Sequence, residues 1–364
     1  MKQKQILRQL TAYQQGKQTH EIKEEYGLEK IVKLASNENV YGYSSKVKAD
    51  LSEHLPELNI YPDGHTAELR TALSKRLAVE EDQLIFGSGS EELIQIICRA
   101  FVQEGSNTVM AANSFPQYKH NTFIEGGTVK EVPIASDGKH DLEAILKAID
   151  VDTVVVWICA PDNPTGTMNT EDQFLQFMKK CPEDVLVVLD EAYREFVEDE
   201  YLLDSTTYTK SFPNLISLRT FSKAYGLAGL RIGYGIGNPE LIHNLNVVRG
   251  PFNTTSVAQR AATVALEDQA FISETTAKNL EVKESFYQFL DELNWDYYRS
   301  HTNFILVSTP ASGLDVFQYL IENGFIIRPG ELLGYPNSIR ITIGTKEDMQ
   351  ELQHLLQKFD EQIR

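Results

Sequence analysis

Residues 215–231 have the sequence LISLRTFSKAYGLAGLR, in which an apolar run is followed by Lys223 and, eight residues later, by Arg231. The apolar run predicts a buried strand, and Gly226 and Gly229 allow tight turns. Lys223 is therefore expected at the carboxyl end of a strand, where α/β enzymes bind ligands. A lysine amine with a lowered pKa can form a Schiff base with an aldehyde, and the Arg231 guanidinium can hold an anion such as a phosphate. A solvated loop lysine is the alternative, and for this stretch alone it is the better interpretation.

The length and charge of the chain limit the classes of protein to which it can belong. With 364 residues, 42% of them hydrophobic and 24% charged, it has the composition of a globular protein with one large and one smaller domain. A formal net charge of -18 argues against a nucleic-acid or anionic-membrane partner, because both present negative charge. Residues 1–20 are polar and charged, and no segment has the run of about 18 apolar residues that a membrane span requires, so we expect a cytoplasmic protein.

Cysteine and histidine give no sign of a metal site. Cys98, Cys159 and Cys181 lie within or beside apolar segments, which suits reduced thiols in or near the core better than disulfides. The eight histidines lack an HExxH motif or a comparable ligand spacing, so we predict no metal.

A second strand with a glycine-containing turn lies nearer the N-terminus. Residues 84–86 form an apolar run, residues 87–92 have the sequence GSGSEE, and the residues that follow predict a helix. A strand, a glycine turn and a helix start together present backbone N–H groups and the positive end of a helix dipole to a phosphate. The third glycine of the dinucleotide fingerprint and the P-loop lysine are absent, so neither NAD nor ATP is favoured. Ser90 as an ordinary helix N-cap is the alternative.

Apolar runs that end at polar or aromatic segments recur along the chain, at residues 108–112, 154–159 and 185–189. Such runs, separated by helices, predict a mostly parallel sheet covered on both faces, with polar residues at the carboxyl ends of its strands. Asp190 ends the third run. Because its neighbours are buried, this carboxylate needs a partner of opposite charge. A helix N-cap is the rival explanation for Asp190.

The requirements of one cofactor account for all of these segments. Pyridoxal 5'-phosphate needs a lysine for its aldehyde, an acid to keep its ring nitrogen protonated, donors for its phenolic oxygen, a flat apolar face and a cradle for a dianionic phosphate. The residues expected to supply these are, in the same order, Lys223, Asp190, Asn163 with Tyr193, Phe115, and Ser90 with Ser222 and Arg231.

These segments resemble the motifs of a known family. The motifs are LTAYQ at 10–14, KLASNEN at 33–39, YPDG at 61–64, NPTG at 163–166, DEAY at 190–193, SKA at 222–224 and IRITIG at 339–344. Together they cover essentially the whole chain, and NPTG, DEAY and SKA are highly specific for the fold type. The chain resembles the fold-type-I pyridoxal-phosphate aminotransferases, and most of all the histidinol-phosphate aminotransferases.

The resemblance implies an α/β fold, with a large domain built on a mostly parallel seven-stranded sheet flanked by helices and a small α+β domain at the C-terminus. We therefore expect an N-terminal arm at residues 1–30, a large cofactor-binding domain at 31–250 and a small domain at 251–364. The alternation of apolar residues in the small domain predicts strands, then a closing helix, at residues 303–308, 325–328 and 339–343 and from Thr345.

The resemblance also assigns roles at the cofactor. Lys223, Asp190 and Tyr193 are the expected catalytic residues. Tyr61 matches a residue that reaches the cofactor phosphate of the other subunit, which implies a homodimer. The expected cofactor contacts within one chain are Gly89, Ser90, Glu91, Phe115, Asn163, Asp190, Tyr193, Ser222, Lys223 and Arg231.

For the substrate, the resemblance points to two arginines near the C-terminus. A solvated position is the default for an arginine on an exposed strand. Family members, however, use the positions of Arg328 and Arg340 for the phosphate of the amino donor or a carboxylate of its partner, which a guanidinium can bind in bidentate fashion. Tyr13 is expected to add a hydroxyl from the arm.

The sequence departs from the family pattern at three places. Val40 and Ala12 stand where proline is common, and Asp162 replaces a frequent asparagine beside Asn163. None of these changes removes a group that the chemistry uses. Asp162 does place a negative charge near the cofactor pocket.

The expected function is transamination between L-histidinol phosphate and 2-oxoglutarate. An aromatic aminotransferase, whether in place of this activity or as a second activity of the same enzyme, would differ only in the lining of its pocket. A phosphothreonine decarboxylase of the same fold would release carbon dioxide instead of forming glutamate. A non-enzymatic regulator that binds pyridoxal phosphate would normally need an appended DNA-binding segment, which we do not expect in a chain this acidic.

Overall fold

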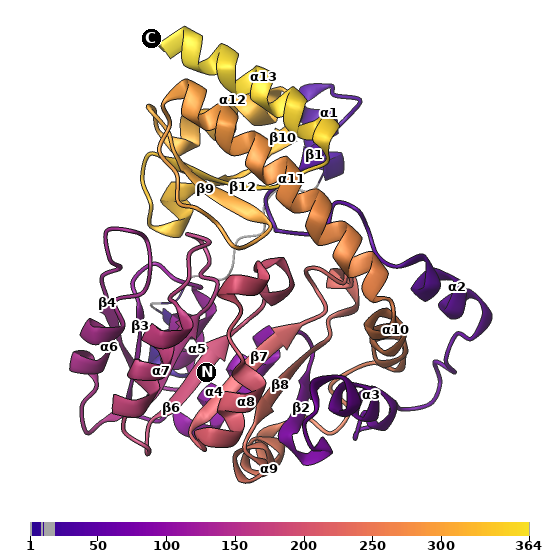
Figure 1. Cartoon of the computed structure of the whole chain (residues 1–364), viewed down its shortest axis with the longest axis vertical. Coiled ribbons are helices and arrows are strands. Elements are labelled where there is room, and N and C mark those ends of the chain that lie inside the picture. Colours follow the sequence, from indigo (N-terminus) through magenta and orange to yellow (C-terminus); the bar gives the residue numbers. More distant parts are fainter. Residues whose placement is uncertain (1, 9, 11–18, 364) are drawn as a thin grey trace.

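The structure, a computed structural model, describes residues 2–8, 10 and 19–363 of the chain. A seven-stranded, mostly parallel sheet forms the centre of the large domain, as the sequence predicted (Figure 1). In this sheet β8 runs antiparallel to both of its neighbours, and the other pairs are parallel. In spatial order the strands are β2 (Leu84–Gly87), β8 (Gly233–Gly237), β7 (Leu215–Thr220), β6 (Leu186–Asp190), β5 (Thr153–Cys159), β3 (Asn107–Ala111) and β4 (Thr128–Val132).

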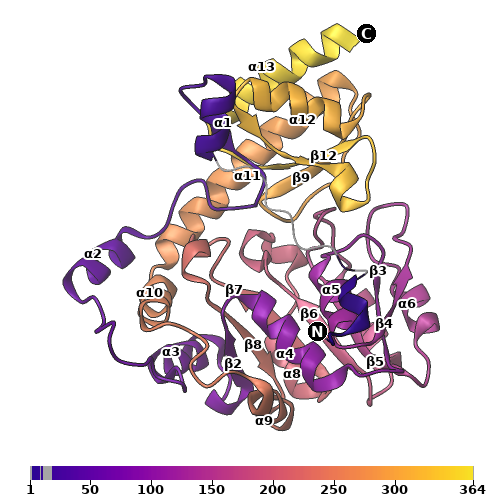
Figure 2. The same ribbon diagram turned by 180° about the vertical axis from the view of Figure 1, so that it is seen from behind.

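Helices cover both faces of this sheet, which explains why its central strands are continuous apolar runs. The face seen in Figure 2 packs against α4 (Ser90–Phe101), α5 (Gln117–Ile124) and α9 (Pro239–Val248). The opposite face packs against α6 (Leu142–Ala148), α7 (Glu171–Lys180) and α8 (Ser205–Ser211). At the β2 end of the sheet lie α2 (Ser45–Glu53), α3 (Ala67–Leu77) and α10 (Ser256–Glu267).

The small domain is built on an antiparallel sheet in the order β11 (Arg328–Pro329), β12 (Ser338–Thr342) and β9 (Phe304–Ser308). Beside it, β1 (Val32–Lys33) pairs in parallel with β10 (Phe325–Ile326). Its helices are α1 (Thr19–Tyr26), α11 (Gln269–Leu293), α12 (Gly313–Glu322) and α13 (Lys346–Ile363). The predicted strands at 303–308 and 339–343 and the closing helix are present with small shifts at their ends. The single strand predicted at 325–328 is instead two short strands, β10 and β11, which belong to different sheets.

Short 3-10 helices complete the described elements. They are η1 (Gln5–Arg8), η2 (Glu81–Gln83), η3 (Arg194–Phe196), η4 (Asp199–Tyr201), η5 (Ala228–Leu230) and η6 (Gly330–Leu333). Among the helices that the structure describes, none has both the length and the apolar character needed to cross a membrane.

The domain boundaries of the sequence analysis stay predictions. Ala258 and Ala262 of α10 belong to the same apolar cluster as Leu84 of the large sheet, whereas Phe286 and Leu290 of α11 pack with the small sheet. This packing favours a boundary within α11 rather than at residue 251. We propose that α11 connects the two domains.

The carboxyl ends of the parallel strands meet at one edge of the large sheet, and the small domain lies over that edge (Figure 1). The strand register places Cys159 beside Asp190, and Asp190 beside Leu218 of β7. The loops after β2, β5, β6 and β7 therefore converge below the small domain, and these loops carry most of the residues expected to bind the cofactor.

Candidate active site

Asp190, the last residue of β6, is only 3% exposed and forms no ion pair with another described residue. Its Oδ2 accepts a hydrogen bond from the Tyr118 hydroxyl at 2.7 Å, and its Oδ1 accepts one from the Ala192 N–H at 3.2 Å. Burial raises the pKa of this carboxyl to about 6, although the Tyr118 hydrogen bond acts in the opposite direction. The residue that caps the following short helix is Tyr193, so Asp190 is not a helix N-cap. A buried carboxylate without a cation suits a positively charged group of a ligand.

Lys223 lies in the loop after β7 and is half-buried. Its Nζ donates a hydrogen bond to the Ser36 carbonyl at 3.0 Å and lies 5.5 Å from the centre of the Tyr193 ring. Desolvation of the amine, together with the positive charge of Arg340, lowers the pKa of Lys223 to about 8. At mildly alkaline pH a large share of this amine is therefore neutral, which is the form that attacks a carbonyl or accepts a proton.

The turn between β2 and α4 faces Arg231. α4 begins at Ser90, and Gly89 before it, at φ +80°, offers no side chain to cap the N–H groups of the first turn. Arg231 Nη1 donates to Ser222 Oγ at 3.2 Å, and its Nη2 lies 3.9 Å from Glu91 Oε2. A Cβ on Gly89 would lie 2.4 Å from Arg231 Nη2, so a side chain there would displace the guanidinium, and the φ of +80° also favours glycine. The structure thus gathers the expected phosphate residues in one group of donors, and Ser90 is not the N-cap.

Three consecutive residues, 35–37, contact three of the expected site residues. The Ala35 carbonyl accepts a hydrogen bond from Arg340 Nη2 at 2.8 Å. The Ser36 carbonyl accepts the hydrogen bond from Lys223 Nζ. The side chain of the third, Asn37, donates from Nδ2 to the Tyr193 hydroxyl at 2.9 Å. This segment therefore joins β1 of the small domain to the centre of the site.

Asn163 and Tyr193, the expected donors to the phenolic oxygen, lie side by side. Asn163 Nδ2 is 3.5 Å from the Tyr193 hydroxyl, and Asn163 Oδ1 accepts a hydrogen bond from Arg340 Nη1 at 2.6 Å. Burial raises the pKa of Tyr193 to about 12, so its hydroxyl keeps its proton at neutral pH.

The two expected substrate arginines are opposite each other in the small sheet, because Arg328 of β11 is the register partner of Arg340 of β12. Arg340 is buried and its guanidinium lies 5.1 Å from the centre of the Phe304 ring. Arg328 is half-buried, and its guanidinium forms no hydrogen bond or ion pair with another described residue. Paired residues of adjacent strands project from the same face, so the sheet presents two cations together.

Two expected site residues are not brought to this centre within the described chain. Tyr61 is 79% exposed, and its ring stacks on Phe252 at a centroid distance of 4.8 Å. Tyr13 lies outside the described residues. The contribution of Tyr61 to a neighbouring subunit stays a prediction.

A family model for aminotransferase class I and II matches residues 29–359 of the chain. The chain belongs to the aminotransferase class I and II family. It is 52% identical over 363 residues to a histidinol-phosphate aminotransferase 2 of Oceanobacillus iheyensis, with all of both chains covered. It is 51% identical to a histidinol-phosphate aminotransferase of Bacillus subtilis, over 98% of this chain and 99% of that one. A crystal structure of the Sinorhizobium meliloti histidinol-phosphate aminotransferase in complex with pyridoxal-5'-phosphate superposes with a TM-score of 0.89 at 26% identity, covering 99% and 98% of the two chains. The resemblance found in the sequence is thereby confirmed.

The residues of this aminotransferase fit pyridoxal 5'-phosphate, which is the cofactor of its family. A lysine with a lowered pKa, a buried carboxylate without a cation and a cradle of N–H and guanidinium donors lie around one loop cluster. The cradle is crowded by its own backbone, since a Cβ on Gly233 would lie 2.6 Å from the Ser90 nitrogen. These features match the aldehyde, ring nitrogen and phosphate of that cofactor.

Two residues of this site were not singled out from the sequence. Tyr118 holds the Asp190 carboxylate, and its ring stacks on Trp157 at 4.8 Å and meets Phe115 edge-on at 5.5 Å. Asn37 lies in the KLASNEN motif at 33–39, and the sequence assigned no role to this residue. A polar residue inside the KLASNEN motif was the available signal for Asn37, whereas nothing local distinguishes Tyr118 from a core aromatic residue.

The carboxylate of Asp162 is buried and held by hydrogen bonds to neighbouring side chains. Its carboxylate accepts hydrogen bonds from Ser114 Oγ at 2.5 Å and Thr165 Oγ1 at 2.9 Å, and lies 3.1 Å from His140 Nε2. Asp162 therefore ties together three loops at the sheet edge. Val40 packs against the apolar cluster of the small domain, and Ala12 lies outside the described residues.

No cluster of three or more histidine, cysteine, aspartate or glutamate side chains suited to a metal ion occurs in the described part of the chain. Cys98, Cys159 and Cys181 are buried and free. Burial raises the pKa of Cys181 to about 11 and that of Cys98 to about 12, so both thiols stay protonated and unreactive.

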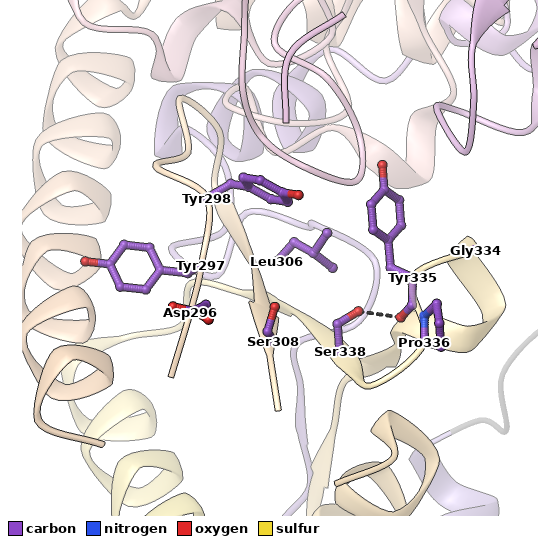
Figure 3. A pocket seen from close by; sticks show the side chains of 9 residues that line it. All are labelled: Asp296, Tyr297, Tyr298, Leu306, Ser308, Gly334, Tyr335, Pro336 and Ser338. Atoms are coloured by element: carbon purple, nitrogen blue, oxygen red, sulfur yellow. Dashed lines mark hydrogen bonds between the residues drawn. The ribbon is translucent and has the colours of Figure 1, made fainter. Parts of the chain in front are cut away.

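A cavity of about 360 Å³ lies elsewhere in the small domain (Figure 3). Its wall includes Leu306, the register partner of Arg340, so the cavity lies on the same face of the small sheet as the Arg340 side chain. The lining contains one carboxylate and no lysine or arginine, which does not suit an anionic substrate. The lining residues are Asp296, Tyr297, Tyr298, Leu306, Ser308, Gly334, Tyr335, Pro336 and Ser338.

Replacing Asp190 by asparagine should change the pH dependence of stability in the cofactor-free protein. The folded-state pKa of about 6 lies above the unfolded value of about 4, so the folded state holds this proton more tightly. The contribution of Asp190 is therefore most favourable below about pH 4 and falls by about 3 kcal/mol as the pH rises to 6. Urea unfolding of wild type and Asp190→Asn at pH 4 to 8 measures the difference.

Asp190→Asn should not show the decrease in stability between pH 4 and 6, and it should also lose turnover. Tyr118→Phe is the matched control, because it keeps the ring but removes a hydrogen bond that lowers the Asp190 pKa, so the fall should extend above pH 6. Identical pH profiles for the wild type and Asp190→Asn would show that this carboxyl is not the raised group.

Proposed function

We propose that this aminotransferase transfers an amino group between L-histidinol phosphate and 2-oxoglutarate in histidine biosynthesis. The observation that carries the proposal is the pair Arg328 and Arg340, two cations that lie opposite each other on one face of the small sheet. Arg340 also donates a hydrogen bond to Asn163, one of the expected cofactor contacts. The relatives that are about half identical over the whole chain bear the name of this activity. A family aminotransferase whose site gathers two guanidinium groups is suited to substrates with anionic ends.

When bound, pyridoxal 5'-phosphate supplies an aldehyde that bonds to amines and a protonated ring that withdraws electrons from the carbon next to the amine. We assign Lys223 to the aldehyde, Asp190 to the ring nitrogen, and Tyr193 with Asn163 to the phenolic oxygen. Phe115 would lie on the ring face. The phosphate would be held by Gly89, Ser90, Glu91, Ser222 and Arg231.

Lys223 is the base of this proposal. Because the pKa of its amine is about 8, Lys223 as a free amine can act as a base and take a proton from the substrate Cα. The protonated amine can then act as the acid that donates this proton later in the same half-reaction. Asp190 is ionised above pH 6, and a cation beside it would favour that ionised form further, so it can hold a proton on the ring nitrogen.

The same pocket must accept two kinds of anion. Histidinol phosphate carries a phosphate and no carboxylate, whereas glutamate carries two carboxylates. We assign Arg328 and Arg340 to these groups, with the Tyr13 hydroxyl as a further donor. The planar fork of an arginine suits both a phosphate and a carboxylate.

We also propose a homodimer in which Tyr61 completes the neighbouring site. The support is the large exposure of Tyr61 together with the apolar surface around it, where Leu55, Leu58 and Ile60 are more than half exposed. Such a patch on a single chain is typical of a protein interface. A cytoplasmic location stays a prediction.

Lys223→Ala should abolish turnover and leave a protein that still binds pyridoxal phosphate noncovalently. Borohydride should fix the cofactor to wild type and not to the variant, because only wild type has the amine. Peptide mapping after reduction identifies the modified residue. A cofactor fixed to any other lysine would end this assignment.

Arg328→Gln should lower kcat/KM for histidinol phosphate and for glutamate by about ten- to a hundredfold, since each charge-assisted contact contributes roughly 1.5 to 3 kcal/mol. Folding should be little affected because the guanidinium forms no hydrogen bond or ion pair with another described residue. Arg328→Lys keeps the charge but not the fork, and an intermediate loss is expected.

Single-turnover measurements with a panel of amino donors, followed by glutamate formation, decide the substrate. Unimpaired histidinol phosphate turnover in Arg328→Gln would remove Arg328 from the site. A wild type more active on phenylalanine than on histidinol phosphate would overturn the substrate in favour of an aromatic aminotransferase.

Tyr61→Phe should raise the dissociation constant of pyridoxal phosphate by about tenfold or more, because a hydrogen bond to a charged phosphate is lost while the ring contact with Phe252 is kept. Sedimentation velocity should show a dimer for both proteins. A monomeric wild type with full cofactor affinity would contradict the shared site.

A further inference from the structure

Asn37 is a buried polar residue held in one conformation. It is 2% exposed, and its φ of +58° lies in the left-handed region that asparagine tolerates better than most residues. Asn303 Nδ2 donates to its carbonyl at 3.1 Å. Its side chain has two neighbours within hydrogen-bonding distance, Thr342 on β12 and Tyr193 on the large domain.

The protons around Thr342 fix the orientation of the Asn37 amide. Thr342 Oγ1 accepts a hydrogen bond from the Asn37 backbone N–H at 3.0 Å. The same hydroxyl donates its proton to Asn37 Oδ1, also at 3.0 Å. The amide oxygen therefore faces Thr342 and the amide nitrogen faces Tyr193, and the reverse orientation would leave the Thr342 proton without an acceptor among the described residues.

The Tyr193 hydroxyl consequently meets donors from the protein. Asn37 Nδ2 donates to it at 2.9 Å. Asn163 presents its nitrogen at 3.5 Å, because its oxygen is bound to the guanidinium of Arg340, which can only donate. No described residue accepts the proton of Tyr193. That proton is left for a bound ligand.

We propose that Asn37 is a positioning residue that, oriented by Thr342, keeps the Tyr193 hydroxyl a donor to the phenolic oxygen of bound pyridoxal phosphate. The inference rests on the proposed function, in which Tyr193 serves that oxygen. It also makes β12 a link between the substrate end and the cofactor end of the site, since Arg340 and Thr342 are two residues apart and lie on the same face of this strand.

Titration of apoenzyme with pyridoxal phosphate, followed by fluorescence, tests the proposal. Asn37→Ala should raise the dissociation constant about three- to tenfold, because the hydrogen bond from the Tyr193 hydroxyl to the cofactor is no longer held in place by Asn37. The pH midpoint of the absorbance change of the bound cofactor should move upward, because a negative charge on the phenolic oxygen loses a fixed donor. In a Tyr193→Phe background Asn37→Ala should have less than a twofold effect on either readout.

Thr342 offers a matched pair of variants in case Asn37→Ala folds poorly. Thr342→Val removes the hydroxyl and should reproduce both shifts, whereas Thr342→Ser keeps the hydroxyl and should resemble wild type. Equal effects of Asn37→Ala with and without the Tyr193 hydroxyl would overturn the proposal and leave Asn37 a structural residue. These readouts use no amino donor, so a wrong substrate assignment would leave them unchanged, and failure of the cofactor to bind wild type would contradict the proposed function instead.

Discussion

The buried carboxylate of Asp190 is the constraint around which this active site is arranged. A charge enclosed by a parallel sheet is costly unless it is hydrogen-bonded and paired, and Asp190 has the hydrogen bonds but no cation. Burial, with no ion-pair partner in the described part of the chain, raises the pKa of its carboxyl. A cationic ring nitrogen would supply that partner, so the same burial that disfavours the charge in the empty protein favours a protonated cofactor ring. Tyr118, which donates to this carboxylate, is itself buried and stacked on Trp157.

The second constraint is the segment at residues 35–37, which crosses from the small domain into the site. Its carbonyls and one amide contact Arg340, Lys223 and Tyr193, so the cation for the substrate, the base and the phenolic-oxygen donor share one backbone reference. Because β1 beside this segment pairs with β10, a shift of the small domain would act on all three groups together. The lowered pKa of Lys223 depends partly on the same arrangement, since the charge of Arg340 is its largest cause after burial.

Much of this could be predicted from the sequence because strand ends and motifs are local. The apolar run ending at Asp190 and the glycine turn before Ser90 were enough to predict a parallel sheet with its ligand edge. β8 was missed because Gly233–Gly237 is too rich in glycine to look like a strand. Tyr118 and the role of Asn37 were missed for a different reason: each depends on a partner far away in the chain, at Asp190 and at Tyr193, and no spacing rule reports such contacts.

The two substrate arginines differ in how far the protein fixes them, and the difference suits a pocket that binds two anions in turn. Arg340 donates to Asn163 and to the Ala35 carbonyl, so its guanidinium is oriented before any ligand arrives. Arg328 opposite it forms no hydrogen bond or ion pair within the described chain, so no polar partner there fixes its guanidinium. A phosphate and a carboxylate differ in size and in the placement of their oxygens, and a pair of rigid cations would fit only one of them well. One oriented and one adjustable guanidinium can bind either anion, and the cost of ordering Arg328 is then borne in both half-reactions.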